Sequence, residues 1–264
     1  MKKIAVLVIA ALTQPIYVHY IKTYWSELIK YTNSETPHID VFLLFEEATE
    51  LGMLNGIKDN IIVDRTTNLS HLCHPRFSST MVPGILSKTV YALELLGDQY
   101  DVLFRTNLSS LIKVTQFNHF LQMKPEICYS GGWVWVDGLR DDLIAHNKIG
   151  VGKSIETLSE LNHYPGNTFI SGSGFLLSAA EAKSLVERKH TIRYDIIDDV
   201  AIGLMMSKHE VLPNFSELIT PDKSTDGIME SLRKTGACHI RLQHFPLDQV
   251  EALWRKLSDD PVWK

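Results

Sequence analysis

Two almost continuous apolar runs near the start of the chain constrain its fold more than any other feature. Residues 4–10 and residues 39–45 are apolar at nearly every position and rich in β-branched side chains, a pattern typical of strands buried on both faces of a sheet. Between them, residues 17–31 carry apolar side chains at helical spacing, and another short apolar run follows at residues 60–64. Strand and helix therefore alternate, which predicts an α/β fold with a mostly parallel central sheet.

The expected sheet also indicates where a ligand would bind. Parallel sheets of this kind bind nucleotides at the carboxyl ends of their strands, and Thr13 lies just past the first predicted strand. Thr13 is therefore a candidate nucleotide contact. Its hydroxyl is equally suited to capping the turn that follows.

Patterns further along the chain predict the remaining elements. Apolar residues at helical spacing predict helices at residues 83–96, 114–122, 179–189, 199–208 and 247–257. Apolar or alternating runs predict strands at residues 100–106, 126–129, 211–213 and 237–244. Residues 214–235 are polar and are expected to be loop-like.

Length, charge and cysteine content narrow the class of protein. The chain has 264 residues, of which 45% are hydrophobic, and this suits one large globular domain spanning residues 1–264. The formal net charge is -5 with no long basic run, so neither nucleic acid nor an anionic membrane is an expected partner. Three widely spaced cysteines, Cys73, Cys128 and Cys238, favour a reducing compartment. No run approaches the length of a membrane span, and residues 4–12 fit a strand better than a signal peptide, so we expect a soluble cytoplasmic protein.

A turn of small residues is followed along the chain by an acidic pair. Residues 171–174 read Ser-Gly-Ser-Gly between two apolar runs, and glycine lets the backbone approach a ligand closely. Asp198 and Asp199 lie further along the chain, at the start of the helix predicted for residues 199–208. The pattern predicts a tight binding loop beside a carboxylate at a helix N-terminus.

These motifs resemble those of a known family. Tyr164-Pro165, the Ser-Gly-Ser-Gly-Phe turn and Asp198-Asp199-Val200 occur in the order found in nucleotide-sugar glycosyltransferases of the GT-A fold, of the β1,3-galactosyltransferase and Fringe type. The resemblance covers residues 80–205. It implies a GT-A-like, Rossmann-like single domain with a nucleotide-binding half at residues 1–110 and an acceptor-binding half at residues 111–264. It also implies an inverting hexosyl- or pentosyltransferase that moves a sugar from a nucleotide sugar, expected to be a UDP-sugar, to a hydroxyl of a glycan acceptor.

The resemblance assigns roles within the expected site. Inverting transfer needs a base that takes the proton from the acceptor hydroxyl, and this role falls to Asp199, while Asp198 caps the helix or orients the site; alternatively, both acids serve only as caps. Cations must meet the charge on the leaving diphosphate. The expected donor-binding residues are Thr13, Lys88, Arg105, Thr106, Asn107, Gly172, Ser173, Gly174, His239 and Arg241.

The sharpest departure from the family concerns its metal site. The family's strand ends in Asp-x-Asp, whose last carboxylate holds a divalent metal, whereas the corresponding residues here are Arg105, Thr106 and Asn107. An amide oxygen is a weaker ligand than a carboxylate for a hard cation. Asn107 and His239 remain as weak candidate ligands for Mn²⁺ or Mg²⁺ that enters with the donor. In a metal-independent version, Arg105 and Arg241 neutralise the diphosphate directly; alternatively, Arg105 pairs with a nearby acid for structural reasons.

A tryptophan-containing segment is the candidate acceptor site. Trp133 and Trp135 alternate with valines and would lie on one face of a strand. If that face is exposed, the rings form a platform on which a sugar can stack, and if it is buried they belong to the core. With Asp137, they are the expected acceptor-binding residues.

Two rival functions remain open. The chain could be a catalytically inactive protein of the same fold that binds a sugar or nucleotide, because the Asp-x-Asp is missing; the retained acidic pair favours catalysis. A different nucleotide-binding α/β enzyme is disfavoured, because neither a glycine-rich dinucleotide motif nor a Walker pattern follows the first strand.

Overall fold

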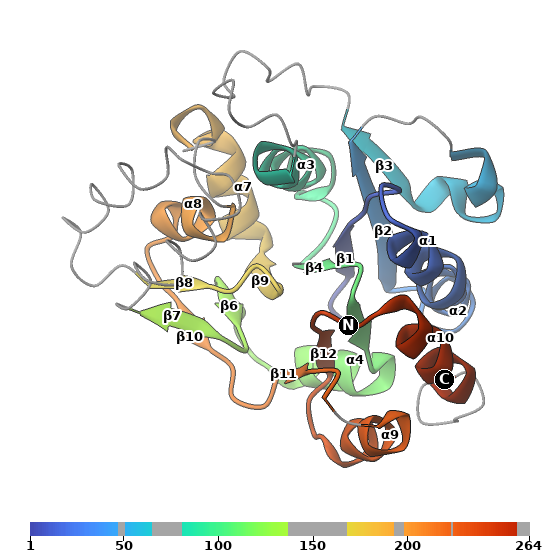
Figure 1. Ribbon diagram of the computed structural model, residues 1–264. Helices are drawn as coiled ribbons and strands as arrows, with labels where there is room; N and C mark the ends of the chain where they lie inside the picture. The colour runs from blue at the N-terminus through green and yellow to red at the C-terminus, as the bar shows by residue number, and fades with distance from the viewer. Residues whose placement is uncertain (47–50, 65–80, 137–167, 193–197, 223, 258–264) are drawn as a thin grey trace, which may run out of the picture.

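The computed structural model describes residues 1–46, 51–64, 81–136, 168–192, 198–222 and 224–257. Over these residues, a seven-stranded sheet with the order β10-β6-β9-β4-β1-β2-β3 forms the centre of the molecule (Figure 1). β9 runs antiparallel to both of its neighbours, and the other pairs are parallel, which confirms the predicted mostly parallel sheet. The strands are β1 (Ile4–Ile9), β2 (Ile39–Glu46), β3 (Ile61–Asp64), β4 (Val102–Asn107), β6 (Ser130–Gly131), β9 (Gly174–Ser178) and β10 (Glu210–Val211).

Helices cover both faces of this sheet, as Figure 1 shows. One face is covered by α1 (Pro15–Tyr20), a π-helical segment η1 (Ile21–Trp25), α2 (Ser26–Glu35) and α4 (Val114–Met123). The helices α9 (Thr225–Lys234) and α10 (Leu247–Leu257) extend the same core, with α10 packed against α1 and α9. The other face is covered by α3 (Met81–Leu96), α7 (Ala179–Glu187) and α8 (Asp198–Met205). Within the described residues, no helix is both long and apolar enough to cross a lipid bilayer.

The continuous apolar run of β1 explains this two-faced burial. Successive side chains of a strand point to opposite faces, so Val6 and Val8 belong to the core under α1 and α2. Leu7 and Ile9 belong to the core under α3, α7 and α8. The same alternation in β4 sends Arg105 toward the second core and Thr106 toward the first, because Phe104 packs in the first. Arg105 and Thr106, although adjacent in β4, therefore lie in different cores on opposite faces of the sheet.

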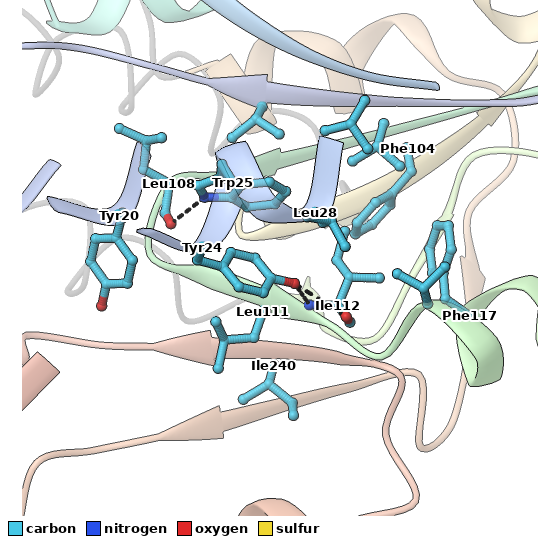
Figure 2. Close-up of a cluster of buried hydrophobic side chains, with 14 of the residues drawn as sticks. Tyr20, Tyr24, Trp25, Leu28, Phe104, Leu108, Leu111, Ile112, Phe117 and Ile240 are labelled. Carbon is cyan, nitrogen blue, oxygen red and sulfur yellow. Dashed lines mark hydrogen bonds between the residues drawn. The ribbon is translucent and has the colours of Figure 1, made fainter. Parts of the chain in front are cut away.

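Smaller sheets flank the centre. β11 (Ser216–Ile219), β12 (His239–Leu242) and β5 (Ser110–Ile112) form one, in that order, and β7 (Val134–Val136) pairs with β8 (Thr168–Ile170). Figure 2 shows the segment after β4 lying against the π-helical turn. The Trp25 indole donates to the Leu108 carbonyl at 2.8 Å, and the Ile112 amide donates to the Tyr24 hydroxyl at 2.6 Å. These bonds fix the path of the chain as it leaves β4.

Several element boundaries differ from the sequence-based expectation. The expectation that residues 214–235 are loop-like is wrong, because they contain β11 and α9. α9 begins after Ser224, whose hydroxyl accepts a hydrogen bond from the Gly227 amide, and its polar composition reflects an exposed face rather than a loop. The strand expected at 126–129 is found instead at Ser130–Gly131, and residues 51–60 form the 3-10 segment η2 (Leu51–Asn60). The other predicted helices and strands within the described residues are confirmed, with ends shifted by a few residues.

Candidate active site

The glycine loop and the acidic pair meet at the carboxyl end of β4. Gly174 lies opposite Thr106 in the β9–β4 pairing, so residues 171–174 lie at the edge of the sheet where the parallel strands β1 and β4 end. The Gly172 amide donates to Asp199 Oδ2 at 3.0 Å. Asp198 is the first residue of α8 and Asp199 the second. The predicted juxtaposition of a tight loop with a carboxylate at a helix N-terminus is therefore confirmed.

Gly172 is held from several sides. Its carbonyl accepts hydrogen bonds from Arg105 Nη1 and from Asn107 Nδ2, the latter at 3.0 Å. A Cβ atom at this position would lie 3.0 Å from Arg105 Nη1 and 3.4 Å from both Asp198 Oδ2 and Asp199 Cβ. The absence of a side chain therefore lets the loop backbone approach β4 and α8 closely. The glycine thus serves close packing within the protein, and the approach to a ligand that the sequence suggested stays a prediction.

Arg105 is buried in an ion pair. Its Nη2 donates to Asp198 Oδ2 at 2.5 Å, and the two side chains are 2% and 9% exposed. The guanidinium lies 5.5 Å from the centre of the Phe175 ring, and its Nε is enclosed without a hydrogen-bond partner. The pairing with a nearby acid, the alternative left open by the sequence, is what the structure shows. The two Nη atoms of Arg105 point inward, to Gly172 and Asp198, and contact with a donor stays a prediction.

His239 lies at the centre of a buried hydrogen-bond chain. The Thr106 hydroxyl lies 2.9 Å from the Ser173 carbonyl, which can only accept, so the hydroxyl proton goes there. Thr106 must then accept from His239 Nε2 at 3.1 Å, which leaves Nδ1 to accept from the Ser216 hydroxyl at 2.8 Å. This assigns the tautomer. Burial, together with the charge of Arg241, lowers the pKa of His239 to about 3, so the ring is neutral at physiological pH.

The chain through His239 bears on the expected metal ligands. Both ring nitrogens of His239 are hydrogen-bonded within the protein and the side chain is fully buried. The Nδ2 atom of Asn107, the other expected ligand, donates to the Gly172 carbonyl, which fixes the plane of the amide whose oxygen is the expected metal ligand. The described residues hold no group of three or more His, Cys, Asp or Glu side chains suited to a metal ion. Both ring nitrogens of His239 are therefore occupied within the protein, and metal binding with the donor stays a prediction.

Arg241 carries an unsatisfied buried nitrogen. Its Nη1 atom is enclosed and has no hydrogen-bond partner, and the same is true of the Tyr20 hydroxyl, which points away from Tyr24 and Trp25 in Figure 2. Burial lowers the pKa of Arg241 to about 10; Tyr20 and Tyr17 raise it and the charge of Arg105 lowers it. Buried polar groups are normally hydrogen-bonded. Arg241 Nη1 and the Tyr20 hydroxyl are therefore two exceptions to this rule.

Tyr129 belongs to the site although the sequence gave no signal for it. Its ring packs against Phe175 with centroids 5.6 Å apart, and its hydroxyl accepts from the Ile170 amide at 3.1 Å. Burial raises its pKa strongly, and the charges of Asp199 and Asp198 raise it further. Tyr129 is therefore an apolar wall beside the acidic pair. Ser216, which fixes the His239 tautomer, was missed for the same reason: neither residue lies in a recognisable motif.

Comparison with known proteins adds a likeness of overall chain path. No protein-family model matches the chain, and no curated protein matches it in sequence. Among solved structures, the galactosyltransferase LgtC in complex with donor and acceptor sugar analogues is 10% identical, with a TM-score of 0.48 over 98% of this chain and 97% of that one. A glycosyltransferase involved in glycosylation of the major capsid of PBCV-1 is 8% identical, with a TM-score of 0.47 over 96% and 98% of the two chains. Mouse xyloside xylosyltransferase 1, in its apo form, is 9% identical, with a TM-score of 0.47 over 92% and 98%.

The remaining expected contacts occupy varied environments. Thr13 is exposed beyond the end of β1. Lys88 is buried in α3, where its Nζ donates to the Ala10 carbonyl at 3.2 Å, so it braces the end of β1 rather than facing outward. Trp133 is half-buried, with its ring 6.3 Å from that of His239. Trp135 lies in β7, and Asp137 lies outside the described residues.

Proposed function

We propose that the chain is an inverting glycosyltransferase that moves a sugar from a nucleotide sugar to a hydroxyl of a glycan acceptor. One observation carries this proposal: the carboxylate of Asp199 is held against the amide of Gly172 at the carboxyl edge of β4. That edge is where sheets of this class bind nucleotides. The UDP-sugar donor and the hexosyl or pentosyl product class are parts of the same proposal. The expected setting remains a reducing cytoplasm.

In the proposed reaction, Asp199 is the general base. The first turn of α8 favours a charged carboxylate, because the helix N-terminus carries partial positive charge. The hydrogen bond from Gly172 to Oδ2 fixes the direction of the carboxylate, and the side chain is half-buried rather than enclosed. A base with a fixed direction takes the acceptor proton as the acceptor oxygen attacks the anomeric carbon.

The donor would lie between the glycine loop and the end of β1. The enclosed, unpartnered Nη1 of Arg241 supports an anionic group of the donor near β12. Proposed direct contacts are Thr13, Asn107, Gly172, Ser173 and Arg241, while Lys88, Thr106, Gly174 and His239 support them from behind. The half-buried Trp133, with Trp135 and Asp137, is the proposed acceptor contact. A divalent metal, if it takes part, would enter with the donor diphosphate, and no step is assigned to it.

A catalytically inactive sugar- or nucleotide-binding protein is the second candidate. The observation in its favour is that Arg105 and Asn107 both bond to Gly172, so the end of β4 braces the loop. A protein of this kind would bind a sugar or nucleotide without transferring the sugar. The two candidates differ only in whether Asp199 has a chemical role.

A paired-variant experiment separates them. A panel of nucleotide sugars is first screened by thermal shift, since a ligand present at 100 times its Kd stabilises the fold by about 2.7 kcal/mol. Transfer to glycan acceptors and slow hydrolysis of the hit are then measured for the wild type, Asp199→Asn and Asp226→Asn. Asp226 is a matched control because it is likewise the second residue of a helix, α9. We expect Asp199→Asn alone to lose about 10²-fold or more in turnover while still binding the donor. Normal turnover by a folded Asp199→Asn protein would rule out the proposed base, and binding without any turnover by the wild type would favour the inactive alternative.

A further inference from the structure

Arg105 closes a ring of interactions around the candidate base. Its Nη1 donates to the Gly172 carbonyl and its Nη2 to Asp198 Oδ2. The Gly172 amide in turn donates to Asp199, which follows Asp198 in the chain. The ring thus runs from Arg105 through the loop to the acidic pair and back, and it joins β4, the glycine loop and α8.

The surroundings of Arg105 make this ring stiff. The side chain is 2% exposed and lies over the Phe175 ring. A buried cation is costly unless it is paired and hydrogen-bonded, so swinging Arg105 out of the ring would leave Asp198 as an uncompensated buried charge. Asn107 adds a second donor to the Gly172 carbonyl. The loop carbonyl is therefore fixed by two side chains from the end of one strand.

The planar fork of the guanidinium is what this geometry requires. Two of its nitrogens point to two different acceptors in fixed directions, whereas a lysine ammonium is a compact charge on a flexible stem. The acceptors belong to different segments of the chain, so one rigid cation sets the distance between them. The direction of Asp199 then depends on Arg105 through Gly172.

We infer that Arg105 is a positioning residue, a fixed internal cation that couples the glycine loop to the acidic pair and so sets the direction of Asp199. Its kinetic consequence rests on the proposed function, but its structural consequence does not. Arg105 does not touch the donor in this role. It holds together the groups that do.

Hydrogen exchange of the loop amides tests the coupling directly. The Gly172 amide is protected by its bond to Asp199, so its exchange rate reports whether that bond is made. Exchange is measured on the whole protein for the wild type, Arg105→Met, Asp198→Asn and the combined variant, relative to the amides of β1. Lys189→Met is the control, because it breaks an exposed ion pair, with Glu94, away from the site. Arg105→Lys replaces Arg105→Met in the same comparison should the latter not fold.

Coupling predicts a specific pattern of rates. Each single variant should accelerate loop exchange by about tenfold or more, the loss expected for a hydrogen bond to a charged group. The combined variant should be no faster than the worse single variant, because both break the same ring. Lys189→Met should match the wild type. Unchanged loop exchange, equal acceleration in the loop and in β1, or additive single effects would each overturn the inference.

The kinetic arm is separate. Where the wild type transfers sugar, Arg105→Lys should lower kcat with little change in donor KM and should retain more activity than Arg105→Met. An equal loss in both variants, or a loss confined to donor KM, would contradict positioning. A wild type without transfer activity would refute the proposed function and leave the exchange test of Arg105 intact.

Discussion

At the scale of single residues, the loop glycines have a packing role inside the protein that could not be predicted from the sequence. A Cβ atom at position 174 would lie 2.6 Å from the Cε1 atom of His239. That ring is fully buried and hydrogen-bonded at both nitrogens, so it has no easy way to move. Gly174 therefore makes room for His239, and a larger side chain there would disturb the core before it met any donor.

Gly174→Ala should lower the free energy of unfolding by about 1–3 kcal/mol, the usual cost of overpacking a filled core. Gly236→Ala is the control, because a Cβ atom at position 236 would have no neighbouring atom within 4 Å. Urea unfolding of the two variants measures the difference. Equal stability of both would show that the His239 ring yields more readily than its hydrogen bonds indicate.

His239 should also make stability depend on pH. Its pKa is about 3 in the folded protein, against an ordinary value of 6.5. Between these two pH values, the imidazole is protonated in the unfolded chain and neutral in the folded protein. Stability must therefore fall as the pH drops through 6.5 toward 3. Between about pH 7.5 and pH 5, His239 should contribute a loss of about 2 kcal/mol.

The comparison of wild type with His239→Gln isolates this contribution. Glutamine retains an N–H donor for Thr106 without titrating in this range. The free energy of unfolding, measured by urea at both pH values, should fall more steeply for the wild type. Parallel pH profiles would mean that His239 is protonated in the folded state.

At the scale of elements, patterns that depend on burial alone were predictable and pairings between distant segments were not. The apolar runs at residues 4–10 and 39–45 identified β1 and β2 because both faces of each strand are buried. The alternation of polar and apolar residues at 237–244 did not show whether His239 lies at the surface or in the core. A half-exposed strand and a strand that packs polar side chains against a buried hydrogen-bond chain have the same sequence pattern. The partner of Arg105 was also unpredictable, because nothing local to residues 105 and 198 records that β4 and α8 meet.

The anchoring of β5 to η1 gives a prediction at this scale. The Tyr24 hydroxyl accepts from the Ile112 amide at 2.6 Å and donates to the Ile112 carbonyl at 3.1 Å. Tyr24→Phe should lower the free energy of unfolding by about 1–3 kcal/mol, because it leaves buried backbone groups unsatisfied. Tyr31→Phe, on α2, is the control, since the Tyr31 hydroxyl makes no hydrogen bond within the described part of the chain. Similar thermal midpoints for the two variants would contradict the anchoring role.

At the scale of the whole molecule, the site is assembled from both halves of the chain. β4 supplies Arg105 and Asn107, the loop before β9 supplies Gly172, and α8 supplies the acidic pair. The sequence predicted which segments take part, from the glycine turn and the two acids. It left open whether Arg105 meets a diphosphate or a nearby acid, because that depends on the direction in which β4 presents alternate side chains.

This assembly bears on metal binding. The described residues lack a cluster of metal-ligating side chains, and a buried arginine stands near the loop. A nucleoside diphosphate carries its own oxygen ligands, so a divalent cation can enter with it. We predict that isothermal titration of the apo protein with Mn²⁺ gives little or no heat, and that binding is measured only with nucleoside diphosphate present. Tight binding to the apo protein would contradict this.

The antiparallel strand β9 has a consequence for synthesis of the chain on the ribosome. β4 pairs with β1 on one side and with β9 on the other, and β9 is made much later than β4. Until residues 174–178 emerge, β4 is an edge strand with an unpaired row of backbone groups, which is a template for pairing with other chains. During this interval, the charge of Arg105 in the centre of β4 would oppose pairing of the open edge with another chain. The residue that organises the finished site would thus also protect the nascent sheet before that site exists.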